Sequence, residues 1–400
     1  MFKKYPWLWV LIAPFLIGFI FSFLVVGGYW FNFTEGMKRV PWFMYILGFY
    51  ITFFITLTIH ELSHLITFVI KGTKIRALYL HMLVFYKTTK GWRVKIKPKL
   101  WFLMGGFVVP DLGEINDDET YQSSVDAFRH SLIVAPYVTI VFLVMSIIIF
   151  MMAIAFGWNP YVIGFYSLFT FYTAILSFFY IKSFKLSNQW FYGDFVAYQK
   201  MKDDLIFQIV QMSQYRMFSL KESKETDMYL FNKVKEAMRS SELKSSLFYQ
   251  LLILNYIEAV TFHGFEDDPS IREKLTRYPY GPHYHTEQGV MLLYDLAVYY
   301  YHLGMIEKSY QLIEQIRKKA SPKIDEKSLL YLRKKHDHIL HIQYDQLFLD
   351  QKEHVKIRNS GLYEDLIDLD EMIKEMHEPL DFKVWETKVE LTQEENEEEV

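Results

Sequence analysis

Apolar and charged positions divide the chain into two parts of different chemistry. Residues 1–200 contain nearly all of the long apolar runs, whereas the later residues are charged and rich in helix formers. This pattern predicts an α-helical membrane protein with a transmembrane domain over residues 1–200 and a soluble all-α domain over residues 201–385. Residues 386–400 are acidic and are predicted to be a disordered tail.

Three apolar runs predict about four membrane spans. Residues 5–34 are uncharged and too long for a signal-peptide core, which favours an uncleaved anchor. Residues 41–70 form the second predicted span. Residues 131–181 are also uncharged but too long for one crossing, and the turn-forming residues 157–160 divide them into a hairpin of two spans.

The distribution of basic residues predicts the orientation of these spans. The loop before the second span has Lys38 and Arg39 against Glu35, whereas the segment after it is rich in lysine and arginine. Basic residues concentrate in cytoplasmic loops. We therefore expect a multi-pass protein of the cell membrane, embedded in the lipid bilayer, with both its N- and C-termini in the cytoplasm.

The segment between the second and third spans is predicted to contain a small membrane-associated β-loop. Apolar and basic residues alternate over residues 92–97, as in a half-buried strand. The edge of such a sheet could pair with an extended substrate, and its basic face could also rest on anionic lipid headgroups. Residues 111–126 hold six carboxylates and are predicted to be a solvated loop.

Residues 292–304 and 307–316 fit the helix-turn-helix unit of a tetratricopeptide-type repeat. Such repeats bind partner proteins on a concave face, so a cytoplasmic protein partner is expected. A plain helical bundle is the alternative. The region after residue 201 has no clear set of metal ligands, and we expect it to be dispensable for metal binding but needed for substrate choice or regulation. His263, His283 and His285 lie in a Gly- and Pro-rich stretch without ligand spacing.

Composition narrows the chemistry that the chain can support. The net charge of −3 provides no basic field, so no nucleic-acid partner is expected. The chain has no cysteine, which excludes disulfides and thiolate metal sites. A zinc site must therefore use His, Asp and Glu.

Residues 60–64 read His-Glu-Leu-Ser-His and lie inside the second predicted span. His60 and His64 are four residues apart on one helical face, so they can hold one Zn2+ with Glu61 beside it as the general base. Ionisable side chains are costly in a bilayer and are functional candidates by default.

Catalytic zinc usually takes three protein ligands, and this motif supplies only two of them. The residues alone do not identify the third. The candidates are carboxylates after the second span: Asp111, Glu114, Asp117 and Asp194.

The chain resembles the site-2 protease family of intramembrane zinc metalloproteases over about residues 40–200. That family pairs its zinc motif with a distant Asp after another apolar segment, and residues 187–194 (Ser-Asn-Gln-Trp-Phe-Tyr-Gly-Asp) occupy this place. Residues 104–110 (Met-Gly-Gly-Phe-Val-Val-Pro) resemble its membrane-associated β-loop. Residues 128–136 (Phe-Arg-His-Ser-Leu-Ile-Val-Ala-Pro) resemble the stretch that leads into its next span.

The resemblance implies that Asp194 is the third zinc ligand, with Asp111 as the second choice. Residues 186–198 would then have to fold back towards the histidines, held by aromatic residues at the membrane interface: Trp190, Phe191, Tyr192 and Phe195. We expected Gly193 to give the backbone the freedom to turn.

The expected function is therefore that of a zinc metalloendopeptidase in regulated intramembrane proteolysis. The family implies a substrate that is a single-span regulatory protein, a signal-peptide remnant or a secreted peptide precursor. The alternative is a non-proteolytic membrane scaffold or binding protein with a structural or relict metal site. A transporter is disfavoured because the two halves lack paired repeats.

Overall fold

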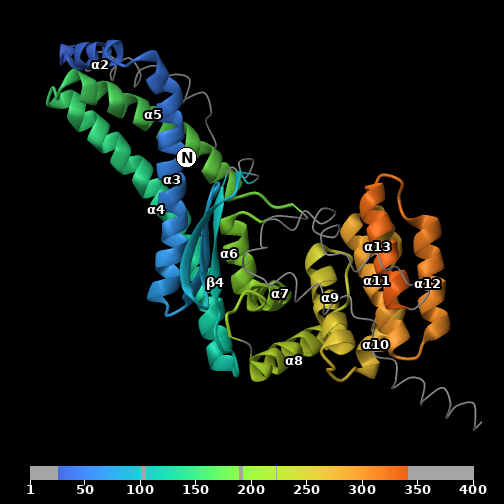
Figure 1. The fold of residues 1–400 in the computed structure, drawn as a ribbon. Coiled ribbons are helices and arrows are strands. Elements are labelled where there is room, and N and C mark those ends of the chain that lie inside the picture. The colour runs from blue at the N-terminus through green and yellow to red at the C-terminus, as the bar shows by residue number, and fades with distance from the viewer. Residues whose placement is uncertain (1–25, 99, 101–104, 189–191, 222, 341–400) are drawn as a thin grey trace, which may run out of the picture.

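The protein is mostly helical, with one small antiparallel sheet (Figure 1). The structure is a computed structural model, and it describes the chain except for residues 1–25, 99, 101–104, 189–191, 222 and 341–400. The predicted acidic tail and most of the first predicted span therefore lie outside the described residues.

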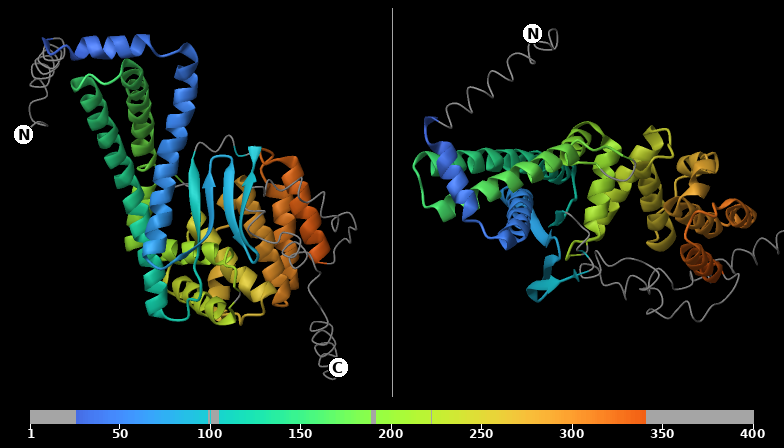
Figure 2. Two further views of the ribbon diagram at one scale, coloured as in Figure 1. Left: turned by 60° about the vertical axis from the view of Figure 1, so that its left-hand side comes forward. Right: turned by 90° about the horizontal axis from the view of Figure 1, so that it is seen from above.

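Among the described residues, three helices are long and apolar enough to cross a membrane. They are α3 (Trp42–Ile70), α4 (Asp118–Ala155) and α5 (Pro160–Ser183), and they lie side by side (Figure 2). The predicted second span and the predicted hairpin are confirmed as helices. The hairpin turns at Gly157, whose φ of 56° suits glycine, and the Asn159 side chain caps α5.

The first predicted span is wrong at its C-terminal end. Gly28 has a left-handed backbone conformation, with a φ of 71°, and a separate helix α2 (Tyr29–Lys38) begins after it. This helix lies across the ends of the three long helices (Figure 2). It packs closely on α5, because a Cβ atom on Gly164 would lie 2.4 Å from the carbonyl oxygen of Gly36.

The predicted small sheet is present beside the C-terminal half of α3 (Figure 2). Its order is β3 (Gly91–Ile96), β2 (Leu83–Thr88), β1 (Lys74–Leu80) and β4 (Gly106–Asp111), and all pairs are antiparallel. The alternating segment at residues 92–97 becomes the edge strand β3, but the predicted half-burial is wrong, because Trp92, Val94 and Ile96 are all exposed. The other edge strand, β4, contacts α3 and so connects the sheet to the histidine motif.

The predicted solvated loop at residues 111–126 is wrong over most of its length. Helix α4 already begins at Asp118, and Asp117 caps it through a capping box with Thr120. Glu114 forms an ion pair with Lys221, and Asp118 forms one with Lys233 of α8. These carboxylates therefore start a helix and fasten it to the helical region that follows.

The chain after α5 is a series of helices at the end of the long helices where α4 begins (Figure 1). Helices α11 and α12 correspond to the predicted helix-turn-helix, and Ser309 of α12 donates a hydrogen bond to the Ala297 carbonyl of α11. The predicted boundary at residue 201 falls inside α6. The elements are α6 (Asp194–Asp203), α7 (Leu205–Arg216), α8 (Lys224–Ser240), α9 (Leu247–Phe262), α10 (Pro269–Thr276), the 3-10 helix η3 (Gly281–His285), α11 (Glu287–His302), α12 (Ile306–Lys319) and α13 (Glu326–Ile339).

Candidate metal centre

Helix α3 carries the histidine motif into the buried interior of the long helices. His60 is 6% exposed and Glu61 is 4% exposed. Positions four apart share a helical face, and the imidazoles of His60 and His64 accordingly meet, with their Nε2 atoms 3.3 Å apart. One face of α3 therefore presents two imidazole nitrogens to a single point.

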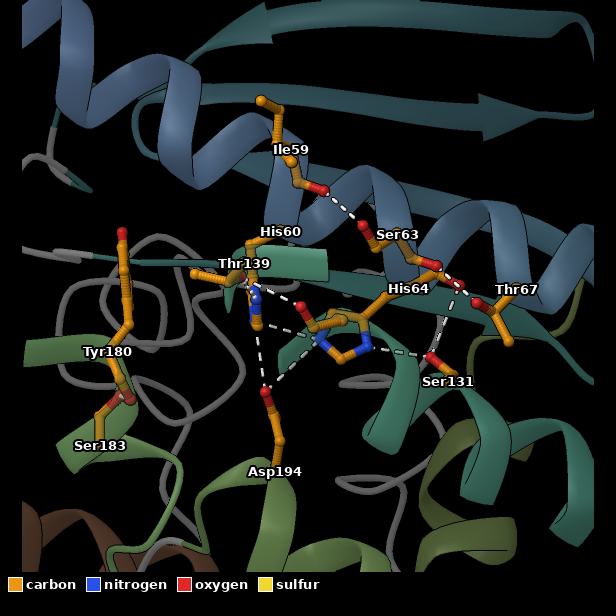
Figure 3. A network of polar contacts seen from close by, with 11 residues as sticks. Ile59, His60, Ser63, His64, Thr67, Ser131, Thr139, Tyr180, Ser183 and Asp194 are labelled. Atoms are coloured by element: carbon orange, nitrogen blue, oxygen red, sulfur yellow. Dashed lines mark hydrogen bonds and ion pairs between the residues drawn. The ribbon is translucent and has the colours of Figure 1, made fainter. Parts of the chain in front are cut away.

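Asp194 joins these two imidazoles from the start of α6 (Figure 3). Its Oδ2 lies 3.2 Å from His60 Nε2 and 3.8 Å from His64 Nε2. Burial alone would raise the pKa of the Asp194 carboxyl, but its hydrogen bond to His60 and the attraction of the imidazoles outweigh burial and hold this pKa below its usual value. Asp194 is therefore ionised at neutral pH, as a metal ligand must be.

Two hydroxyl groups orient the imidazoles. Thr139 Oγ1 lies 2.9 Å from His60 Nδ1 and donates its own proton to the Ala135 carbonyl, so it must accept the Nδ1 proton. Ser131 Oγ lies 3.0 Å from His64 Nδ1 (Figure 3). With the protons on Nδ1, both Nε2 lone pairs face Asp194. In metal sites, a hydrogen bond to the second ring nitrogen fixes the histidine tautomer in the same way.

The three ligand atoms fit a metal ion. Two Nε2 atoms and a carboxylate oxygen face one another at 3.2–3.8 Å, an arrangement that a metal ion stabilises and that, without one, a proton on His60 Nε2 also satisfies as a hydrogen bond to Asp194. Ligand atoms about 2.0–2.1 Å from a tetrahedral metal lie about 3.3–3.4 Å apart. Of the described residues, only His60, His64 and Asp194 form a group of this kind.

A tight hairpin brings Asp194 back to α3. Gly193 N donates to the Leu186 carbonyl and Phe195 N donates to the Phe184 carbonyl, so the chain reverses after α5. Our explanation for Gly193 was wrong: its φ is −68°, which any residue can adopt. Glycine is needed there because a Cβ atom would lie 2.0 Å from the carbonyl oxygen of Ser183.

Two of the four aromatic residues that are predicted to anchor this hairpin, Phe195 and Tyr192, pack on other aromatic rings of the protein. Phe195 packs edge-on against Phe184, with ring centroids 5.8 Å apart, and Phe184 stacks on the His60 imidazole at 5.1 Å. Tyr192 stacks on Phe248 of α9. The other two predicted anchors, Trp190 and Phe191, lie outside the described residues.

Glu61 lies next to His60 in the sequence and packs against strand β4. A Cβ atom on Gly106 would lie 2.8 Å from Glu61 Cγ and 2.3 Å from the carbonyl oxygen of Tyr79. Glu61 Oε2 is buried and has no hydrogen-bond partner among the described residues. A buried carboxylate oxygen without a partner is costly, so it points to a missing donor such as water or substrate.

The other candidate ligands have different structural roles. Asp111 Oδ1 accepts a hydrogen bond from Gly113 N at the end of β4, Glu114 pairs with Lys221, and Asp117 caps α4. His283 is buried against Tyr278, with ring centroids 5.1 Å apart, and belongs to no ligand group among the described residues. Of the four carboxylates, only Asp194 meets the imidazoles.

Thr139→Val should lower the affinity for Zn2+ by about 10- to 100-fold, because His60 loses the acceptor that fixes its tautomer. Thr173→Val is a matched control. Thr173 is also fully buried, in α5, but its hydroxyl donates a hydrogen bond to the Phe169 carbonyl and not to an imidazole. Competition with a zinc chelator measures both variants. An equal loss of affinity in the two would contradict the orienting role of Thr139.

No protein-family model, curated protein or solved structure matches this chain.

Proposed function

We propose that this protein is an intramembrane zinc metalloprotease, as its resemblance to the site-2 proteases implies. The observation that carries the proposal is the buried carboxylate of Glu61 beside the two imidazoles of the apolar helix α3 and the Asp194 carboxylate that meets them from α6. A purely structural metal site needs no general base. A catalytic site needs one, together with three protein ligands and one open position.

The residues around the metal divide the chemistry between them. Zinc held by His60, His64 and Asp194 would polarise the scissile carbonyl and acidify water. Glu61 accepts the proton of the attacking water and returns it to the leaving nitrogen. Thr139 and Ser131 keep the imidazoles in place during these proton transfers.

The proposed substrate is a membrane-spanning or membrane-associated protein or peptide precursor that is cut within or beside its span. At about 1.5 Å per residue, His60 lies roughly 15 Å along α3 from its C-terminal end. A helix hides its backbone, so the substrate must be extended to be cut. Strand β4 supports this step because it is an edge of the sheet and begins beside Glu61.

The proposed topology has four spans, the first of which includes residues preceding α2, and places both termini in the cytoplasm. The observation that supports this is that the basic segment after α3 and the helices from α6 onward lie at the same end of the long helices. Helices α11 and α12 form one antiparallel pair, which fits a repeat-like surface for a cytoplasmic partner.

Reporter fusions to the C-terminus should show it in the cytoplasm, because the basic cluster after α3 outweighs the weakly basic loop before it. Protease protection on spheroplasts measures the same property. An extracytoplasmic C-terminal domain would overturn the membrane topology.

The proteolytic proposal is tested by labelling protein N-termini in membranes that contain the wild type or His60→Ala. We expect new termini within or beside transmembrane segments in the wild-type membranes only, and their loss on treatment with a zinc chelator. The rival function, a non-proteolytic scaffold, predicts identical termini in both membranes.

A further inference from the structure

An aromatic contact links the metal-ligand hairpin to the helical region. The Tyr192 ring stacks on Phe248 of α9, with centroids 5.1 Å apart and an interplanar angle of 20°. It also lies 5.7 Å from the ring of Phe207 in α7, and the Phe207 and Phe248 rings are themselves 4.9 Å apart. We call these three rings the aromatic clamp.

The clamp lies two residues from the third metal ligand. Tyr192 forms a β-bridge with Ser187, so it is the returning arm of the hairpin that follows α5. Gly193 and Asp194 come next, and Gly193 is wedged against the carbonyl oxygen of Ser183 without room for a side chain. The backbone between the clamp and the Asp194 carboxylate is therefore short and tightly packed.

Other contacts hold α6 independently of the clamp. Phe195 packs on Phe184 and Tyr137, so the N-terminal turn of α6 stays against α5 and α4 when the clamp is removed. Loss of the clamp should therefore leave α6 attached through Phe195 and change only the placement of the residues that precede Phe195, which include Asp194.

We propose that Tyr192 and Phe248 are positioning residues through which the helical region sets the zinc affinity of the membrane site. This inference rests on the proposed function, since it requires Asp194 to be a ligand. A cytoplasmic partner that displaces α9 would release Tyr192, weaken the Asp194 bond and reduce the bound metal. The helical region is then a regulatory element, as expected from the sequence, but it acts through the zinc affinity, for which the sequence predicted it to be dispensable.

The test uses the full-length chain in lipid nanodiscs, with Phe248→Ala to open the clamp. The expected result is a zinc affinity about 10- to 100-fold lower than that of the wild type, the range found when outer contacts of a metal ligand are lost. Phe248→Tyr, which keeps the ring, should restore the affinity. The matched control is Phe265→Ala, because Phe265 is also half-buried and packs on one ring, that of Phe231, away from Tyr192.

The visible spectrum of the Co2+-loaded protein gives a second readout that a general loss of stability does not mimic. The spectrum of Phe248→Ala should shift towards that of Asp194→Ala, whereas Phe265→Ala should keep the wild-type spectrum even if its melting temperature falls as far. Equal affinities in Phe248→Ala and the wild type, or equal losses in Phe248→Ala and Phe265→Ala, would overturn the proposal.

The same series separates this inference from the proposed function. If the wild type binds zinc and His60→Ala does not, the site stands, and the behaviour of Phe248→Ala decides the role of the clamp alone. If the wild type binds no zinc, or if His60→Ala binds it equally well, the proposed function fails first.

Discussion

Glu61→Gln should lower proteolysis by a factor of about 100 to 10,000 while leaving zinc bound, because positioned general bases contribute about that much to rate. The amide has the shape of the carboxylate but cannot accept the proton of water. Glu61 does not belong to the group formed by His60, His64 and Asp194, so replacing its carboxylate should leave the metal in place. The measurement is cleavage by the purified protein, together with its zinc content.

The control for this variant is His60→Ala, which should lose zinc and activity together because it removes a ligand. A Glu61→Gln protein that still cleaves at the wild-type rate would eliminate the general-base role and the enzyme hypothesis in its present form. A Glu61→Gln protein that loses zinc would instead make Glu61 a ligand, contrary to the observed geometry.

Asp194→Ala should lower zinc affinity by more than about 100-fold, since even the outer hydrogen-bond partners of metal ligands are worth about 10- to 100-fold. Among the described residues, Asp194 alone brings a carboxylate to the two Nε2 atoms, so the variant leaves two imidazoles with an incomplete site. Chelator competition measures the affinity, and the melting temperature reports whether the hairpin remains folded.

Asp111→Ala is the matched comparison, because Asp111 is the alternative ligand and lies at the end of β4 away from the imidazoles. It should keep the wild-type zinc affinity. Loss of zinc in Asp111→Ala alone would show that the ligand assignment is wrong although the histidine pair survives. Wild-type affinity in both variants would remove the carboxylate from the site altogether.

Hydropathy and periodicity predicted the parts of the fold that depend on local sequence. The span at residues 41–70 and the hairpin at residues 157–160 follow from apolar length and a turn signal, and both appear as α3, α4 and α5. Residues 92–97 alternate, and they form β3. The pairing of His60 with His64 follows from helical spacing alone.

The remaining features depend on contacts between distant residues, which a local pattern cannot show. Most carboxylates of the acidic segment at residues 111–126 are exposed as predicted, but the segment is not a loop throughout, and Glu114 pairs with Lys221, 107 positions away. Thr139 is 79 positions from the imidazole that it orients. The break after the first apolar run also escaped prediction, because average hydropathy does not register the backbone conformation of Gly28.

The choice of Asp194 as the third candidate ligand shows what the family resemblance added to the reading of the residues alone. Spacing alone left four carboxylates open, and the family pattern selected Asp194, which the structure brings to the histidines. The reason for the neighbouring Gly193 was not predictable, since close approach to the Ser183 carbonyl exists only in the folded hairpin. The Tyr192–Phe248 contact likewise joins segments that no sequence motif connects.

The most direct test of the central claim is elemental analysis of the purified wild type beside His60→Ala, both prepared in the same membrane mimetic. We predict about one zinc per wild-type chain and less than about a tenth of that in His60→Ala, because catalytic zinc requires its full set of protein ligands. A wild type without zinc, or two proteins with equal zinc, would contradict the metal centre and the function built on it.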